Sequence, residues 1–285
     1  MLSLTDQSVN EGKTRMGKTV ETRVGPVAFS DTGDGSVVVL LHATLHDHHD
    51  FDAIAPALHR DYRVIALDWP GHGDSPAPAA GHRPTAASFA EVLADVVTAL
   101  NLPAAAIVGN SVGGFAAARL AITHPELVSR LVLVNTGGFL SSPLTNLYCR
   151  AMGTPAVMRR ILPRFIRSYM KATGDTDHAV EDRAVARART RDGADLEAAL
   201  WRSFATPEFD LRSAAGSITA PTLIVWGSLD TAIPMRFGRA TRDAIPGSRL
   251  EVLPTGHVPF ASDPEGFLAI AAPFLAAGRV ADTAQ

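Results

Sequence analysis

Short apolar runs recur along the chain, and longer amphipathic segments separate them. Residues 86–100, 112–123 and 264–277 carry apolar side chains at helical spacing. The short runs are largely aliphatic and mostly continuous, as in strands buried on both faces, and comprise residues 36–41, 62–67, 104–108, 129–134, 221–226 and 248–253. Strands that alternate with helices predict an α/β fold, in which helices cover both faces of a mostly parallel central sheet.

One segment breaks this alternation. Residues 140–212 contain no strand-like run, are rich in Arg and Ala, and have helix-like pieces at 156–170 and 177–189. We expect a helical lid over the strand ends rather than an ordinary group of surface helices. The predicted organisation is a flexible N-terminal tail (1–17), a core (18–139 and 213–278) and the lid (140–212).

Composition narrows the class of protein. The 285 residues are 46% hydrophobic with a formal net charge of -3, which is typical of a globular chain and gives no basic excess for nucleic acid. No apolar stretch is long enough to span a membrane, and the polar N-terminus has no secretory signal. We expect a cytoplasmic protein that acts on a small molecule, without a nucleic-acid or membrane partner. The oligomeric state stays open, and the single cysteine, Cys149, excludes an intrachain disulfide.

The third predicted strand leads into a candidate nucleophile. Gly109-Asn110-Ser111-Val112-Gly113 has the pattern G-x-S-x-G, and a predicted helix follows it. In this context the serine occupies a sharp, strained turn that exposes its hydroxyl, and the glycines allow the close approach of the backbone.

A serine needs a base, and two side chains after later strands provide a base and an acid. His257 follows the last predicted strand, and Asp230 follows the one before it. We expect both at one sheet edge, where Asp230 orients His257. The alternatives are a helix cap for Asp230 and a buried loop role for His257. Asn135 follows another strand in a comparable place but cannot serve as an anionic acid.

A tetrahedral intermediate requires two hydrogen-bond donors. We assign one to the backbone N–H of Val112, the residue after the serine. The second is expected from the loop after the first predicted strand, where Thr44 is favoured and Ala43 or Leu45 is the alternative if the loop is shifted.

Residues 18–278 resemble the α/β-hydrolase superfamily, which has the order Ser, Asp, His along the chain. Asp68 to Ser75 is similar to its D-x-x-G-x-G-x-S loop, whose role there is structural. The usual His-Gly of the oxyanion loop appears as His42-Ala43. The resemblance implies hydrolysis without a cofactor or metal.

Other polar groups suggest further chemistry. Residues 46–50 read His-Asp-His-His-Asp, but no second set of metal ligands stands out downstream. We expect a solvated helix start capped by Asp47, or a polar rim of the substrate mouth. The lid arginines are expected on solvated helix faces, although one of them could bind a substrate carboxylate.

The serine favours a small, fairly apolar carboxylic ester or thioester as substrate. The elbow from Gly109 to Gly114 is also similar to that of meta-cleavage-product hydrolases, which cut C–C bonds. Those enzymes carry a lid arginine, but they have Trp where this chain has Val258. A cofactor-free haloperoxidase-like enzyme and a ligand-binding protein are further alternatives. The candidate substrate contacts are His42, Asn110, Arg183, Arg187 and Val258.

Overall fold

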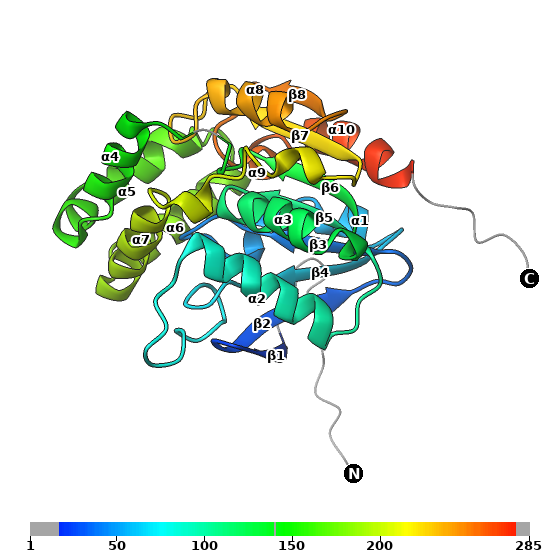
Figure 1. The fold of residues 1–285 in the computed structure, drawn as a ribbon, viewed down its shortest axis with the longest axis horizontal. Coiled ribbons are helices and arrows are strands. Elements are labelled where there is room, and N and C mark those ends of the chain that lie inside the picture. The colour runs from blue at the N-terminus through cyan, green and yellow to red at the C-terminus, as the bar shows by residue number, and fades with distance from the viewer. Residues whose placement is uncertain (1–16, 140, 278–285) are drawn as a thin grey trace, which may run out of the picture.

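The structure, a computed structural model, describes residues 17–139 and 141–277 and contains one eight-stranded sheet (Figure 1). The strand order is β1-β2-β4-β3-β5-β6-β7-β8. The strands are β1 (Lys18–Thr22), β2 (Gly25–Thr32), β3 (Val37–Leu41), β4 (Arg63–Leu67), β5 (Ala105–Asn110), β6 (Val128–Val134), β7 (Thr222–Gly227) and β8 (Arg249–Leu253). From β4 to β8 every pairing is parallel, which confirms the predicted α/β class.

Two strands were not predicted. β1 and β2 form an antiparallel hairpin, and β2 pairs with β4, also antiparallel. β1 is mostly exposed, with the buried side chain of Val20 among polar neighbours, so it lacks the aliphatic run that marks the inner strands. Almost all of the predicted N-terminal tail lies outside the described residues.

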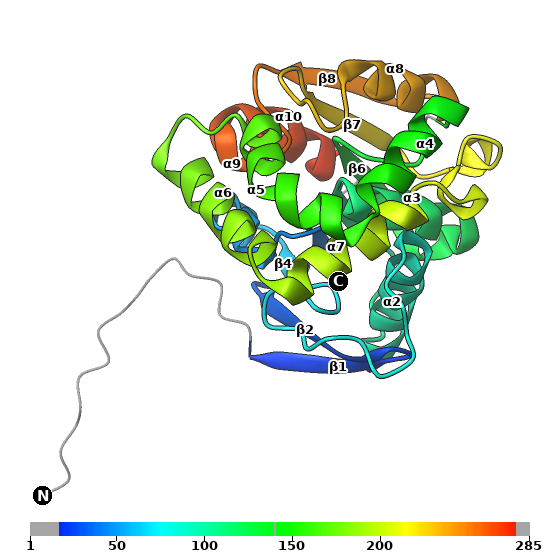
Figure 2. The same cartoon turned by 90° about the vertical axis from the view of Figure 1, so that its left-hand side faces the viewer.

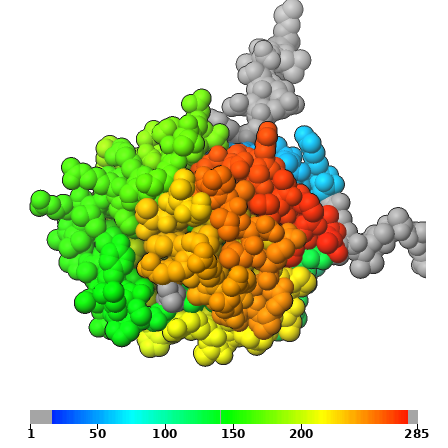
Figure 3. All heavy atoms as spheres, turned by 90° about the horizontal axis from the view of Figure 1, so that it is seen from above, coloured from blue at the N-terminus to red at the C-terminus, as the bar shows by residue number. Residues whose placement is uncertain are grey.

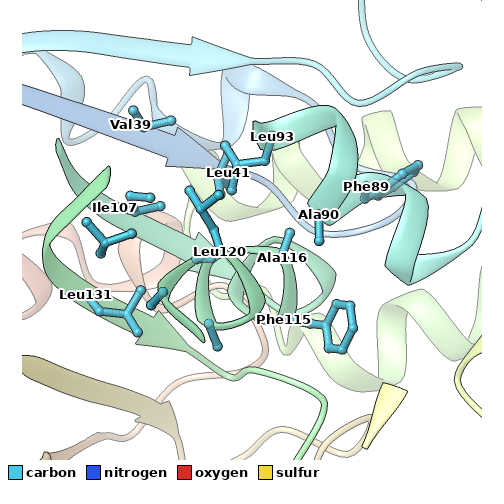
Figure 4. Close-up of a cluster of buried hydrophobic side chains, with 14 of the residues drawn as sticks. Val39, Leu41, Phe89, Ala90, Leu93, Ile107, Phe115, Ala116, Leu120 and Leu131 are labelled. Atoms are coloured by element: carbon cyan, nitrogen blue, oxygen red, sulfur yellow. The ribbon is translucent and has the colours of Figure 1, made fainter. Parts of the chain in front are cut away.

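Helices cover both faces of the sheet, because the strands of a buried parallel sheet present apolar side chains on each side. In β3, Val39 and Leu41 face one core, and Val38 and Leu40 face the other. Figure 4 shows the first core, where α2 and α3 pack on the strands. The helices flanking the sheet are α1 (Ala55–Leu58), α2 (Ala86–Ala99), α3 (Val112–Thr123), α8 (Met235–Ala244), α9 (Pro259–Ser262) and α10 (Pro264–Ala276).

In the described residues, four α-helices lie between β6 and β7 in the chain: α4 (Pro143–Met152), α5 (Pro155–Met170), α6 (Asp175–Ala188) and α7 (Arg191–Ser203). They gather at the left-hand end of the molecule in Figure 1 and face the viewer in Figure 2, and the view from above shows them in green beside the orange region of α8 and β8 (Figure 3). No strand occurs in residues 141–212. Within the described part of the chain, no helix is long and apolar enough to cross a membrane.

Candidate active site

The turn between β5 and α3 holds Ser111 in a strained conformation. Its φ is 56° and its ψ is -114°, outside the regions that side chains other than glycine usually adopt. Close packing enforces this turn, because a Cβ at Gly109 would lie 2.5 Å from the Gly113 carbonyl oxygen, and one at Gly113 would lie 2.5 Å from the Leu41 carbonyl oxygen. Glycine is therefore required on both sides of the serine.

His257 and Asp230 meet at the carboxyl ends of the last two strands. His257 Nδ1 lies 2.6 Å from Asp230 Oδ2, and both side chains are buried. Asp230 Oδ1 accepts from the backbone N–H groups of Ala232 and Ile233 at 2.8 and 3.1 Å. The aspartate therefore contacts the histidine and also closes the loop turn that follows it. The alternative of a helix cap is wrong, because α8 begins at Met235 and its N-cap is Pro234, without a side-chain cap.

The backbone around His257 is held by two further contacts. The amide of Asn110, the residue before the serine, donates to the carbonyls of Val134 and His257 at 3.0 Å each. The N–H of His257 donates to the carbonyl of Tyr169 at the end of α5 over 2.9 Å. Asn110 thus holds the backbone of His257 in place through hydrogen bonds and does not line the cavity.

Ser111 and His257 open into one cavity of about 430 Å³ at the strand ends. Among the described residues no hydrogen bond joins Ser111 Oγ to His257. Catalytic hydrogen bonds of this kind often shorten only when the substrate binds. The two side chains therefore share one cavity but are not in direct hydrogen-bond contact. The cavity wall is largely apolar and aromatic, and its aromatic side chains are Tyr148, Phe165, Tyr169, Trp201, Phe204, Phe209 and Phe237.

The predicted oxyanion residues Thr44 and Val112 both line this cavity. Among the described residues, no backbone carbonyl accepts from the N–H of either one. Neither N–H therefore has a backbone partner; one belongs to a residue of the loop that follows β3, and the other to the first residue of α3, where the helix dipole favours negative charge.

Like Asn110, the other four predicted substrate contacts lie off the cavity wall, so these predictions are wrong. His42 is fully buried, with Nε2 accepting from the Trp69 N–H at 3.1 Å, and Val258 is fully buried as well. Arg183 Nε lies 3.3 Å from Asp47 Oδ1, and Arg187 Nη1 donates to the Gly71 carbonyl at 2.7 Å. Both arginines bind core loops and hold α6 against them. Neither guanidinium is therefore available to a substrate beside Ser111.

The acidic and histidine-rich segment 46–50 is largely buried, with only His49 half-buried, and none of its residues lines the cavity, so neither the solvated helix start nor the polar rim predicted for it is observed. Asp47 does cap the short 3-10 helix η1 (His48–Phe51), accepting from the His49 N–H at 3.1 Å. His48 lies against Asp68, with Nδ1 2.9 Å from Oδ2. Burial alone would raise the pKa of Asp68, but the hydrogen bond from His48 and the nearby histidines hold it at about 2.

The segment from Asp68 to Ser75 forms hydrogen bonds with β2 and with His48. Ser75 Oγ donates to the Asp68 carbonyl at 2.7 Å and accepts from the Ala28 N–H at 2.8 Å, so it joins the loop to β2 and is not a second nucleophile. His48, Asp68 and Asp74 could offer metal-ligand atoms within 4.8 Å of one another. However, three N–H donors from His48 and Asp74 already surround the Asp68 carboxylate.

Two polar residues of the site were missed by the sequence reasoning. Glu197 of α7 lines the cavity and is buried. It shares one helix face with Ala194, Ala198 and Trp201, and this position on an apolar stripe was the available signal. Arg236 also lines the cavity and forms no ion pair with another described residue; nothing in its local sequence marks it.

Together, the sheet order and the serine turn define an α/β-hydrolase fold with a serine-containing cavity at the strand ends. The family model for the alpha/beta hydrolase fold matches residues 36–264, so the chain belongs to this family. A pimeloyl-[acyl-carrier protein] methyl ester esterase of Neisseria meningitidis is 31% identical over 245 residues, which cover 82% of this chain and 91% of that protein.

A 2-hydroxy-6-oxononadienedioate/2-hydroxy-6-oxononatrienedioate hydrolase of Cupriavidus pinatubonensis is 32% identical over 240 residues, covering 78% of this chain and 81% of that protein. Among solved structures, a hydrolase from Pseudomonas aeruginosa superposes with a TM-score of 0.77 at 26% identity, covering 91% of this chain and 98% of that one. These relatives support hydrolase activity of the esterase type.

Proposed function

We propose that the protein is a serine hydrolase that cleaves a carboxylic ester or thioester of an uncharged, largely apolar acyl group. The observation that carries this proposal is the cavity in which Ser111, His257, Thr44 and Val112 meet within an aromatic wall. Its volume of about 430 Å³ is within the usual range for small-molecule sites.

In the proposed mechanism, Ser111 Oγ attacks the substrate carbonyl while His257 Nε2 takes its proton. Asp230 holds the other imidazole nitrogen as a donor and stabilises the imidazolium that forms. The N–H groups of Thr44 and Val112 bind the oxyanion. His257 then protonates the departing alkoxide or thiolate, and water releases the acid from the acyl-serine by the same steps.

The helices α4 to α7 act as a lid in this proposal. Side chains of α4, α5 and α7 complete the cavity wall, among them Tyr148, Phe165 and Trp201. These groups enclose the substrate and exclude water from the reacting atoms, which strengthens the electrostatic contacts made there.

Cleavage of a C–C bond in a diketo acid is less well supported, although the relative from Cupriavidus pinatubonensis is named as a hydrolase of oxo-dioates. The substrate would need a cation for its carboxylate, and the two lid arginines considered for that role bind elsewhere. Arg236 is the only Lys or Arg on the described cavity wall, and it is exposed. An uncharged ester therefore fits the cavity better.

The test is covalent labelling with a fluorophosphonate, followed by hydrolysis of p-nitrophenyl esters of increasing acyl length. We expect one adduct on the intact protein, no adduct on Ser111→Ala, and a loss of kcat of at least about 1,000-fold in that variant. Ser262→Ala, a serine outside the cavity, is the matched control. Labelling that survives in Ser111→Ala would refute the assignment, and a protein that binds but never turns over esters would favour a ligand-binding role.

A further inference from the structure

Glu197 is an unusual side chain for the wall of an apolar cavity. It comes from α7 in the lid, is only 2% exposed, and supplies the single carboxylate on the described cavity wall. No Lys, Arg or His among the described residues forms an ion pair with it. A buried carboxylate without a cationic partner is costly, so its presence beside the reacting groups calls for an explanation.

The contacts of this carboxyl lead to the oxyanion loop. Thr44 Oγ1 donates to Glu197 Oε2, and Trp201 Nε1 donates to Oε1 at 2.7 Å. Thr44 is the residue whose backbone N–H is proposed to bind the oxyanion. The carboxyl group is therefore one hydrogen bond away from the residue that stabilises negative charge in the reaction.

The titratable and charged groups around Glu197 come from several other parts of the chain. Tyr169 of α5 places its hydroxyl 3.2 Å from His46 Nε2, and His46 Nδ1 lies 2.6 Å from Asp50, which also contacts Arg183. His257 lines the same cavity from the loop after β8. His46 and Arg183 contact Asp50, and His257 contacts Asp230. Arg236 lines the same cavity from α8 but is exposed and forms no ion pair with Glu197.

We propose that Glu197 is a positioning residue that supports turnover as a neutral acid and opposes it as a carboxylate. The neutral acid can donate to Thr44 Oγ1 and so keep the oxyanion loop in place, with donor and acceptor exchanged. The carboxylate keeps the contact but sets a negative charge close to the developing oxyanion in a cavity of low dielectric. This inference rests on the proposed acyl-serine mechanism.

The environment of Glu197 makes both forms accessible. Burial raises its pKa to about 7, although the hydrogen bonds from Thr44 and Trp201 and the charge of His46 act in the opposite direction. As pH rises through the pKa of Glu197 the neutral acid is lost, and the rate of acylation of Ser111 should fall.

The experiment compares the pH dependence of kcat/KM for a neutral p-nitrophenyl ester in the wild type and in Glu197→Gln. Glutamine keeps the size and hydrogen bonding of the neutral acid but cannot ionise. We expect the wild type to lose about 10-fold or more on the alkaline side, between about pH 6 and pH 9, and the variant to lose no activity there. At low pH the two rates should agree.

Asp195→Asn, which removes a surface carboxylate on the same helix, is the matched control and should keep the wild-type profile. Thr44→Val supplies a second readout, because removing a hydrogen bond that lowers the pKa of Glu197 should move the alkaline decline to higher pH. A decline that is unchanged in both Glu197→Gln and Thr44→Val would overturn the inference.

Failure of the proposed function has a different signature. In that case neither the wild type nor Glu197→Gln would react with fluorophosphonate at any pH, and the positioning role would fall with the mechanism. A labelled and active wild type with no alkaline decline would instead overturn the role of Glu197 alone. Infrared difference spectra give a further check, since the protonated carboxyl band of Glu197 should decrease as pH rises through about 7 in the wild type and be absent from Glu197→Gln.

Discussion

Asn135 Nδ2 donates to Asp230 Oδ2 over 2.6 Å, and this is the same oxygen that contacts His257 Nδ1. The amide oxygen of Asn135 accepts from the Gly227 N–H at 2.9 Å. Asn135 therefore joins the ends of β6 and β7 and fixes the rotation of the carboxylate. The position that could have held an acid holds instead the group that orients the acid.

Replacing Asn135 by Ala should lower both the free energy of unfolding and kcat. The change leaves the buried Gly227 N–H without its partner and removes one donor from Asp230, at a cost of about 1–3 kcal/mol in the free energy of unfolding. Urea unfolding measures that loss, and kcat for a p-nitrophenyl ester should fall while KM changes little. Wild-type stability and rate in this variant would show that Asn135 does not support the site.

Asp230→Asn tests the orientation of the histidine. The amide cannot stabilise the imidazolium and favours the wrong tautomer of His257, so we expect kcat to fall by about 1,000- to 10,000-fold. Binding of a non-hydrolysable substrate analogue, measured by calorimetry, should change little. Asp243→Asn, a change at an exposed carboxylate of α8, serves as the control. A rate close to that of the wild type would move the acid to another residue.

The ionisation of Glu197 should also appear in the pH dependence of stability. Its pKa is about 7 in the folded chain and 4.5 for the ordinary side chain, so the folded state binds more protons between these values. Stability should therefore fall as pH rises from about 4.5 to about 7, by about 3 kcal/mol at most, and then level off.

Urea unfolding at a series of pH values measures this effect, and Glu197→Gln should remove its share of the decline. The difference between the two proteins is expected to favour the variant increasingly up to pH 7. Equal pH dependence in both would mean that the carboxyl stays ionised in the fold.

Arg236 should affect only substrates with a negative end. It is exposed at the cavity wall and its guanidinium lies 5.2 Å from the ring centre of Phe237. Because solvent screens an exposed cation, Arg236→Gln should lower kcat/KM about two- to five-fold for a half-ester of a dicarboxylic acid, and leave a neutral ester unaffected. Arg183→Gln is the comparison, since that arginine lies off the cavity; an equal loss there would contradict the assignment.

The arrangement around Ser111 was predictable because each part of it follows a recognisable strand. The apolar runs locate the strand ends, and the carboxyl ends of parallel strands share one edge, which brings Asp230 and His257 together. The strained turn followed from the two glycines flanking Ser111. The β1–β2 hairpin was missed because an exposed edge pair has no continuous apolar run.

Substrate contacts were not predictable in the same way. Arg183 and Arg187 carry the right charge, but their direction depends on how α6 packs on core loops far away in the sequence. The same packing buries His46 and Asp50, which read as solvated from the sequence alone. Glu197 was overlooked because an acidic residue on an amphipathic helix usually faces water.

The hydrogen bond from His257 N–H to the Tyr169 carbonyl has a consequence for engineering. A Cβ at Gly256 would lie 1.9 Å from the Met170 carbonyl oxygen, so the end of α5 also packs directly against the loop that carries the base. A chimera that exchanges helices α4 to α7 with those of another hydrolase would disturb proton transfer as well as specificity. Graft boundaries that retain Tyr169 and Met170 from this chain would preserve the support of the base.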